Sequence, residues 1–322
     1  MQLLKTPQGR DGLGLLALAG VLVLVQLLVR DHFYRSVLLQ AIIFAVAATG
    51  MTLLVGFAGQ ISLGQNAFMA MGAYGFAYGV QKTGLHPLLA LGIATLLPTV
   101  VGYLVARPIL RLSGHYLALA TLALGSAGYI FASRWTDVTG GLDPGVLDLP
   151  KFVLVPGWAG DQFFPLAALC LLAVLGLSLV LVHSAIGRSL QAIHTSEVVA
   201  ACAGIRVERT KAAIFALAAG CAGLSGGLYA LFMRSFNASS FSIMVSIELL
   251  MMVIVGSLST VWGSLVGALL VTLLPHVLEH FESAKLFVYG TLMTLVVMFM
   301  PNGLASSLFS GLRRLLGARR SA

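Results

Sequence analysis

Charged side chains are scarce in this chain. They make up 9% of its 322 residues, whereas soluble domains average roughly 25%. Apolar residues make up 59%. The 19 basic and 11 acidic residues cannot supply the charged surface that a water-soluble fold of this length needs. The composition therefore excludes a soluble enzyme, a nucleic-acid-binding domain and a disordered chain. It predicts an all-α, polytopic protein of the lipid bilayer.

Cysteine is also rare. Cys170, Cys202 and Cys221 lie far apart and form no C-x-x-C pair, which excludes a disulfide framework and a cysteine-based zinc site. The stretch from His276 to His280 matches the metalloprotease pattern H-x-x-E-H. A catalytic zinc needs a third protein ligand, however, and Glu282 is the only carboxylate that follows. We therefore expect no metal site.

Two further catalytic motifs are missing or incomplete. No lysine follows a glycine, so the chain has no P-loop, and any ATP that drives it must bind another polypeptide. The Gly223-Leu-Ser225-Gly stretch resembles the serine motif of rhomboid-type intramembrane proteases. That chemistry needs a histidine within a later span to accept the serine proton, and none is present. We expect no catalytic residue, with an intramembrane protease as the enzyme alternative.

The net charge of +8 comes from cations that are spread along the chain instead of forming a patch. This distribution is typical of membrane topology, in which cytoplasmic loops are enriched in Lys and Arg, and not of nucleic-acid binding. A crossing helix needs about 20 apolar residues. The candidate runs are Leu13–Val29, Val37–Phe57, Ile61–Val80, Leu88–Ala106, His115–Ala132, Phe164–Val182, Ala212–Met233, Ile243–Leu274 and Ala284–Met300.

The run Ile243–Leu274 is too long for one crossing. A polar step flanked by Gly256 and Gly263 interrupts it, and dividing it there gives ten spans. With both termini inside, 12 of the 19 cations are cytoplasmic, in agreement with the positive-inside rule. Residues 1–322 then form a single membrane domain, with an external loop at 133–163 and a basic cytoplasmic segment at 183–211.

The cytoplasmic segment predicts two short helices. Thr195 or Ser196 can cap the second helix, and Gly204 can supply the left-handed residue that ends it. Glu197, Ala200, Ala201 and Gly204 follow an i, i+3, i+4, i+7 spacing, which places them on one face. This small, nearly flat face suits a groove on another protein.

The pattern E-x-x-A-A-x-x-G-I from Glu197 to Ile205 resembles the coupling helices of ABC importer membrane subunits. Other stretches are similar to the LIV-type permeases of branched-chain amino acid importers, in a consistent order from about Leu38 to Leu274. The subunit with the extended external T-G-G loop is the most similar. The stretches are Leu54–Phe68, Gly72-Ala-Tyr74, Gly114–Leu122, Thr139-Gly140-Gly141, Gly187–Lys211, Ser246–Met251 and Trp262-Gly263.

This resemblance implies an ABC importer permease fold in a bacterial inner membrane, with alternating access driven by ATP. It implies a second, unlike permease subunit, two ATPases that carry ATP and Mg, an external solute-binding protein and no cofactor on this chain. The implied roles are ATPase coupling for Gly187, Arg188, Glu197, Ala200, Ala201, Gly204 and Ile205; the translocation path or its gating for Gln60, Ser62, Gln65, Asn66 and Glu248; and binding-protein docking for Thr139, Gly140 and Gly141.

The solute is less closely defined by the sequence. The family often has His-Ala where this chain has Gln65-Asn66. Branched-chain amino acids are the expected substrates, and urea, short amides or other amino acids are the alternatives. An ion-coupled secondary transporter is the alternative mechanism, but within the apolar runs only Glu248 suits a coupling ion.

Overall fold

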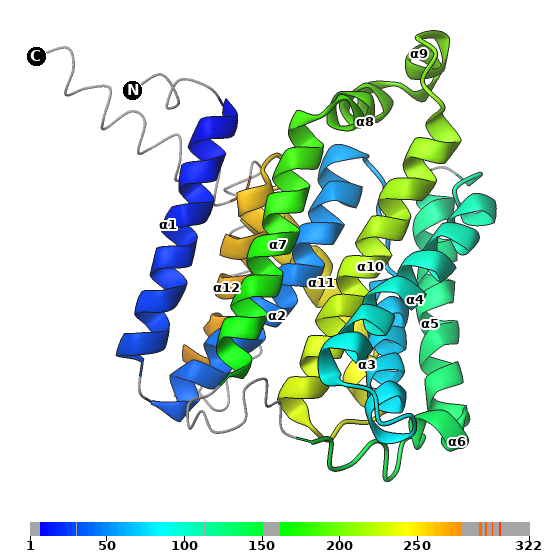
Figure 1. The fold of residues 1–322 in the computed structure, drawn as a ribbon. Coiled ribbons are helices and arrows are strands. Elements are labelled where there is room, and N and C mark those ends of the chain that lie inside the picture. The colour runs from blue at the N-terminus through cyan, green and yellow to red at the C-terminus, as the bar shows by residue number, and fades with distance from the viewer. Residues whose placement is uncertain are drawn as a thin grey trace, which may run out of the picture.

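The structure is a computed structural model that describes residues 7–29, 31–112, 114–150 and 162–277, together with 290, 291, 294, 298 and 303. The described part is a bundle of helices (Figure 1). The helices are α1 (Pro7–Leu28), α2 (His32–Thr52), the π-helix η2 (Leu53–Phe57), α3 (Gln65–Gln81), α4 (Pro87–Ile109), α5 (His115–Arg134), α6 (Thr136–Thr139), α7 (Phe163–His183), α8 (Ala185–Thr195), α9 (Glu197–Cys202), α10 (Val207–Met233), the 3₁₀ helix η3 (Ala238–Phe241), α11 (Ile243–Gly256) and α12 (Val261–Val277).

Seven helices in the described part are long and apolar enough to cross a membrane, and α12 is a shorter apolar helix. Together with α3 they account for nine of the ten expected spans. The division of Ile243–Leu274 is confirmed, because α11 ends at Gly256 and α12 begins at Val261. The tenth expected span, Ala284–Met300, and the Glu279-His280 half of the H-x-x-E-H motif lie outside the described residues.

The expected span Ile61–Val80 begins later than the apolar run suggests. Its helix, α3, starts only at Gln65, and residues 58–64 between η2 and α3 are not helical. Within a membrane, such irregular backbone is tolerated only where protein or a water-filled cavity surrounds it. The irregular segment 58–64 should therefore be enclosed by other helices or line a water-filled cavity.

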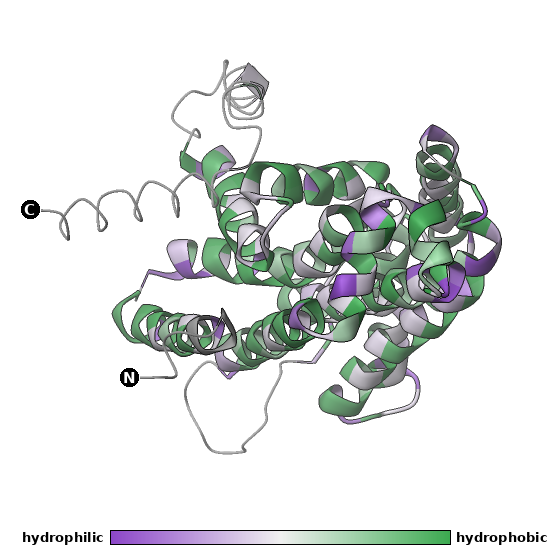
Figure 2. Ribbon diagram, turned by 90° about the horizontal axis from the view of Figure 1, so that it is seen from above, coloured by the Kyte–Doolittle hydropathy of each residue, from purple (hydrophilic) through white to green (hydrophobic). Residues whose placement is uncertain are grey.

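The centre of the bundle is formed by α2 and α10, which are the most deeply buried of the long helices. Glycine allows α3 to pack unusually close to α10: a Cβ at Gly72 would collide with the backbone of Gly223, and one at Gly226 with the Met69 carbonyl. Small residues at helix contacts are typical of membrane bundles. Figure 2 shows that the helices are largely hydrophobic, and many of their large apolar side chains are exposed, as a lipid environment requires.

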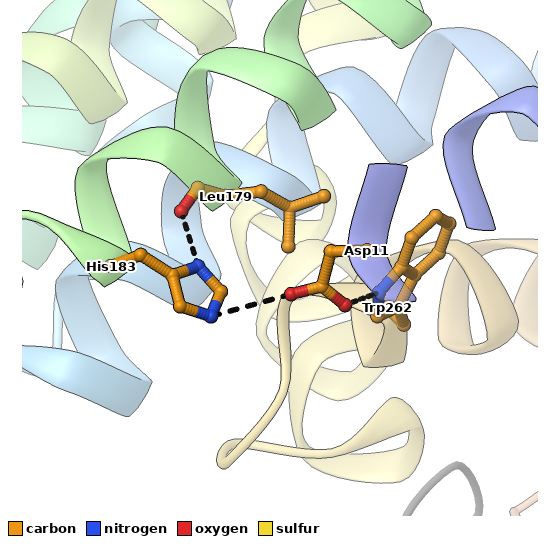
Figure 3. Close-up of polar contacts among 4 residues, drawn as sticks. All are labelled: Asp11, Leu179, His183 and Trp262. Atoms are coloured by element: carbon orange, nitrogen blue, oxygen red, sulfur yellow. Dashed lines mark hydrogen bonds and ion pairs between the residues drawn. The ribbon is translucent and has the colours of Figure 1, made fainter. Parts of the chain in front are cut away.

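The helix α1 lies at the edge of the bundle, and a cluster of three polar side chains connects it there (Figure 3). Asp11 Oδ2 is 3.4 Å from His183 Nε2, at the end of α7. The Trp262 indole donates a 3.2 Å hydrogen bond to Asp11 Oδ1 from the first turn of α12. His183 Nδ1 bonds the Leu179 carbonyl at 2.8 Å, which fixes the ring. The first helix is thus joined to two distant parts of the chain.

The two segments expected on opposite sides of the membrane lie at opposite ends of the bundle. Figure 1 shows α8 and α9 at one end and α6, with the loop that follows it, at the other. We call these the α9 end and the α6 end. The contact between Asp11 and His183 places the start of α1 at the α9 end.

Candidate functional site

The irregular segment 58–64 carries the polar residues expected to line a passage. It leaves η2 at the α9 end, where the Gln60 N–H donates to the Leu54 carbonyl, and it then runs along α5. Thr121 on α5 holds it there by accepting a 3.0 Å hydrogen bond from the Leu63 N–H. A Cβ at Gly64 would lie 3.6 Å from the backbone nitrogen of Gly125, so the segment lies directly against the middle of α5.

Three side chains of this region have buried polar atoms without a hydrogen-bond partner among the described residues. They are both amide atoms of Gln60, the hydroxyl of Ser62 and both amide atoms of Gln65. The three residues are 3%, 1% and 1% exposed. Each such atom costs about 1–3 kcal/mol when it stays unsatisfied. A concentration of them in one short stretch indicates a place where polar groups from outside the chain bind.

Asn66 differs from these neighbours. Its side-chain amide donates to the carbonyls of Gly125 and Phe241, at 3.2 and 3.1 Å, and its Oδ1 accepts from Ser246. The Asn66 N–H donates to the same Ser246 hydroxyl at 2.8 Å. The structure therefore shows Asn66 joining α3 to α5, η3 and α11. The amide of Asn66 is thus engaged within the chain, and its assignment to the translocation path or its gating stays a prediction.

Glu248 lies on a different side of α11 from Ser246. Two residues along a helix are about 200° apart, so Glu248 shares a face with Met244 and neighbours Ile247. Met244 and Ile247 are exposed and Glu248 is half-buried. The carboxylate therefore belongs to an open, otherwise apolar face of α11 and is separate from the group of Gln60, Ser62 and Gln65.

The helix α8 rests against the start of the irregular segment. Ser184 caps α8 by accepting a hydrogen bond from the Ile186 N–H, and Leu190 and Ile193 pack into the bundle. A Cβ at Gly59 would lie 2.9 Å from Cδ2 of His194, so the last turn of α8 touches the residue that precedes Gln60. The end of α8 and the start of the irregular segment are therefore in direct contact.

At the start of α8, Gly187 and Arg188 have different environments. Gly187 is buried, and a side chain there would collide with the Val182 backbone, so only glycine lets α8 turn this tightly away from α7. The Arg188 side chain is exposed. Gly187 therefore shapes the segment, while Arg188 is accessible at the α9 end.

The face predicted for α9 is only partly correct. Its helix runs for six residues, and Ser196 is the capping residue, with its hydroxyl accepting from the Val199 N–H. Ala201 and Gly204 are exposed, but Ala200 is only 1% exposed because it packs against its own chain. The large apolar side chains that α9 presents to the outside are those of Val198 and Val199, which are 74% and 67% exposed.

An ion pair fixes this orientation. Glu197 pairs with Lys211 in the second turn of α10, and the Lys211 side chain is buried. At the other end of α9, Gly204 has a φ of +82°, and the Ile205 N–H donates to the Ala200 carbonyl at 3.1 Å. The predicted left-handed termination at Gly204 is therefore confirmed.

At the α6 end, the Thr139-Gly140-Gly141 stretch is a tightly held turn. The Thr139 hydroxyl lies 2.6 Å from the Ala132 carbonyl and accepts a hydrogen bond from the Gly141 N–H. Both glycines have positive φ values. The following residues are bound to the link between α10 and η3 through an isolated antiparallel bridge of Val146 with Phe236. This end of the bundle is closed by hydrogen bonds between segments far apart in the sequence.

The alternative catalytic motifs are occupied by packing contacts. The Ser225 hydroxyl is buried and donates to the Ile43 carbonyl at 2.7 Å, so it is not poised as a nucleophile. His276 bonds the Thr272 carbonyl through Nδ1, and its ring packs edge-on against Phe33. Within the described part of the chain, no group of three potential metal ligands occurs.

Comparison with known proteins gives a consistent result. Residues 33–298 match the family described as "Branched-chain amino acid transport system / permease component". The chain is 30% identical over 288 residues to the high-affinity branched-chain amino acid transport system permease protein LivM of Escherichia coli (strain K12), covering 81% of this chain and 67% of the relative. It is 29% identical over 288 residues to the LivM protein of Salmonella typhimurium, with the same coverage of both chains. No solved structure gives a significant match.

Proposed function

The chain belongs to the permease-component family of branched-chain amino acid transport systems, and we propose that it moves branched-chain amino acids through the membrane by alternating access. It does so as a subunit of an ATP-binding-cassette importer. Two ATPase chains hydrolyse ATP with Mg, a second, unlike permease completes the membrane part, and an external solute-binding protein delivers the amino acid. The absence of a P-loop from the sequence supports hydrolysis on separate chains.

The contact of α8 with the irregular segment is the observation that carries this proposal. His194 touches Gly59, and the buried, unpartnered side chain of Gln60 comes next in the chain. A helix that is moved from the α9 end therefore acts directly on the polar residues within the bundle. The exposed Val198 and Val199 on α9 give an ATPase a hydrophobic contact, with the small residues Ala201 and Gly204 and the partly exposed Ile205 next to it.

Two polar regions then serve the passage. Gln60, Ser62 and Gln65 offer amide and hydroxyl groups that suit a zwitterion, because they can donate to its carboxylate and accept from its ammonium group. Glu248 lies on the open face of α11, where the second permease completes the passage. The turn at Thr139, Gly140 and Gly141 supports the surface on which the solute-binding protein docks.

This function requires the α9 end to be cytoplasmic, with both termini on that side of the inner membrane. In a variant whose other two cysteines are replaced by alanine, the native, exposed Cys202 reports on this end. Replacing the exposed Leu142 by cysteine, in a chain without the native cysteines, reports on the α6 end. A membrane-impermeant maleimide added to intact cells should label Leu142→Cys and leave Cys202 unlabelled. The opposite pattern would contradict the proposed orientation.

The transport function is tested with the permeases and ATPases in proteoliposomes. Uptake of labelled leucine, isoleucine and valine should require ATP and the solute-binding protein, and an excess of urea or short amides should not compete. Gln65→Leu should reduce uptake at least about tenfold, since it removes both polar atoms of a buried side chain. Gln81→Leu is the matched control, because this residue makes one exposed hydrogen bond to the Leu147 carbonyl. Uptake driven by an ion gradient without ATP would overturn the assignment.

A further inference from the structure

A separate polar cavity lies at the α9 end, outside the groups discussed so far. It has a volume of about 310 Å³ and is formed where α4 ends and α10 begins. Three arginines and one glutamate reach it, in addition to a tyrosine and two apolar residues. The lining residues are Tyr103, Arg107, Leu110, Arg111, Glu208, Arg209 and Ala212.

The charge of this cavity is predominantly positive. Arg107, Arg111 and Arg209 contribute three positive charges and Glu208 one negative charge, which leaves an excess of two. Among the residues that the structure describes, none of these four makes an ion pair within 4.0 Å. The three guanidinium groups therefore have free hydrogen-bond donors, and guanidinium is the group best suited to phosphate oxygens.

Two features indicate that the cations are arranged to receive an anion. The Arg107 guanidinium lies over the Tyr103 ring, 5.0 Å from its centroid, and is 3.4 Å from the Tyr103 hydroxyl, which restricts its orientation. Arg209 is in the first turn of α10, where the positive end of the helix dipole disfavours a cation. A bound anion would relieve this repulsion.

The cavity lies at the boundary of the membrane-spanning part. Arg107 is in the last turn of the spanning helix α4, and Arg209 is in the first turn of the spanning helix α10. Val100, Leu104 and Arg107 follow an i, i+4, i+7 spacing, so they share one face of α4, and Arg111 lies two residues beyond the end of this helix. Val100 and Leu104 are exposed. The same face thus changes from arginine at the cavity to uncovered apolar side chains within the membrane.

We infer that this cavity binds the phosphate group of an anionic phospholipid, with an acyl chain lying along Leu104 and Val100. The phosphate ester is the chemistry that the three arginines recognise. The exposed apolar side chains favour a lipid over a soluble phosphate, which would make no use of them. Basic cavities between membrane helices at the headgroup level are a known form of lipid recognition.

The position of α9 favours a lipid over an ATPase as the occupant of the arginine cavity. In Figure 1, α8 and α9 extend beyond the ends of α4 and α5 at this end of the bundle, so a protein that docks on α9 meets a different level of the molecule. The site is independent of the amino acid passage, since none of Gln60, Ser62, Gln65 and Glu248 lines the cavity.

The experiment uses the full chain in nanodiscs that contain equal amounts of phosphatidylglycerol and phosphatidylcholine. Native mass spectrometry then counts the lipids that stay bound after release. The wild type should retain more phosphatidylglycerol than phosphatidylcholine. Combined replacement of Arg107, Arg111 and Arg209 by glutamine should reduce that retention at least about tenfold. Arg134→Gln, at the α6 end, is the control and should have no effect.

Glu208→Gln separates this result from misfolding, because it removes the only negative charge in the cavity. It should increase phosphatidylglycerol retention about two- to fivefold, a gain that a damaged protein would not show. Retention that is unchanged in both the triple variant and Glu208→Gln would overturn the inference. So would displacement of phosphatidylglycerol by millimolar inorganic phosphate, which would assign the cavity to a soluble anion. Loss of ATPase association in the triple variant, with lipid retention intact, would assign it to a protein partner.

Discussion

Asn66 and Ser246, 180 residues apart in the sequence, form a reciprocal pair of hydrogen bonds. The Ser246 hydroxyl accepts from the Asn66 N–H at 2.8 Å and donates to Asn66 Oδ1 at 2.9 Å. Both residues are completely buried. The pair fixes the first turn of α3 against α11, directly after the irregular segment.

Ser246→Ala should destabilise the protein, because it leaves the Asn66 N–H without its partner and removes the donor to Asn66 Oδ1. Each buried group left unsatisfied costs about 1–3 kcal/mol. A lower thermal unfolding midpoint in detergent, followed by tryptophan fluorescence, is the expected result. Ser242→Ala is the matched control on the same helix, since the Ser242 side chain makes no capping hydrogen bond. Equal midpoints for the two variants would show that the pair contributes little.

Gly204→Val should impair coupled transport because a β-branched residue does not readily adopt a φ of +82°. An added side chain would meet no atom within 4 Å, so the effect arises from backbone conformation and not from a clash within this chain. The expected cost is about 1–3 kcal/mol. Uptake and solute-stimulated ATP hydrolysis should fall together.

Gly204→Asn is the control for this conformational explanation, because asparagine tolerates the left-handed region better than other side chains. It should retain most of the activity. Ala201→Trp tests the docking surface instead, since Ala201 is exposed on α9. It should release the ATPases while the permease stays in the membrane. Full coupled transport in both Gly204→Val and Ala201→Trp would refute the coupling role of α9.

Glu197→Gln should loosen α9, because the buried ammonium group of Lys211 would lose its counter-charge. Lys211 is buried although Glu197 is exposed, so leaving this cation without its partner is more harmful than replacing both residues. The double variant Glu197→Gln with Lys211→Met should therefore recover part of the loss. A double-mutant cycle on ATPase co-purification measures this coupling. Additive effects of the two single changes would show that the pair does not orient α9.

Asp11→Leu should detach the start of α1, because it removes both the polar contact with His183 and the acceptor of the Trp262 hydrogen bond. A cysteine pair at Leu15 and Gly176 reports the distance, since a Cβ at Gly176 would lie 3.7 Å from Leu15 Cδ1. Oxidative cross-linking of this pair should drop several-fold in Asp11→Leu. Asp31→Leu, at the start of α2 where the side chain makes no capping bond, should leave it unchanged.

Several local features were predictable from the sequence because they depend on neighbours in the chain. The cap at Ser196, the left-handed Gly204 and the break after Gly256 all follow from residue type and spacing. The burial of Ala200 was not predictable, since it depends on the pairing of Glu197 with Lys211 across a turn.

Long-range contacts explain the other differences. The sequence groups Asn66 with Gln60, Ser62 and Gln65 as one polar strip, but its amide is used by Gly125 and Phe241, which lie 59 and 175 residues away. Hydropathy also predicts a span from Ile61, whereas α3 begins at Gln65. A hydropathy profile records how apolar a stretch is and contains no information about which backbone groups find partners elsewhere.

The irregular segment 58–64 has a mechanical consequence. An α-helix is stiff along its axis because each turn is braced by several backbone hydrogen bonds, and bending it means breaking them. Between η2 and α3 the backbone is held mainly by the bond of Gln60 to Leu54 and that of Leu63 to Thr121. This stretch is the compliant joint of its span, and α8 touches it at Gly59. Because the flanking helices are stiff, a displacement at the α9 end should deform mainly this segment, next to the unpartnered amides of Gln60 and Gln65.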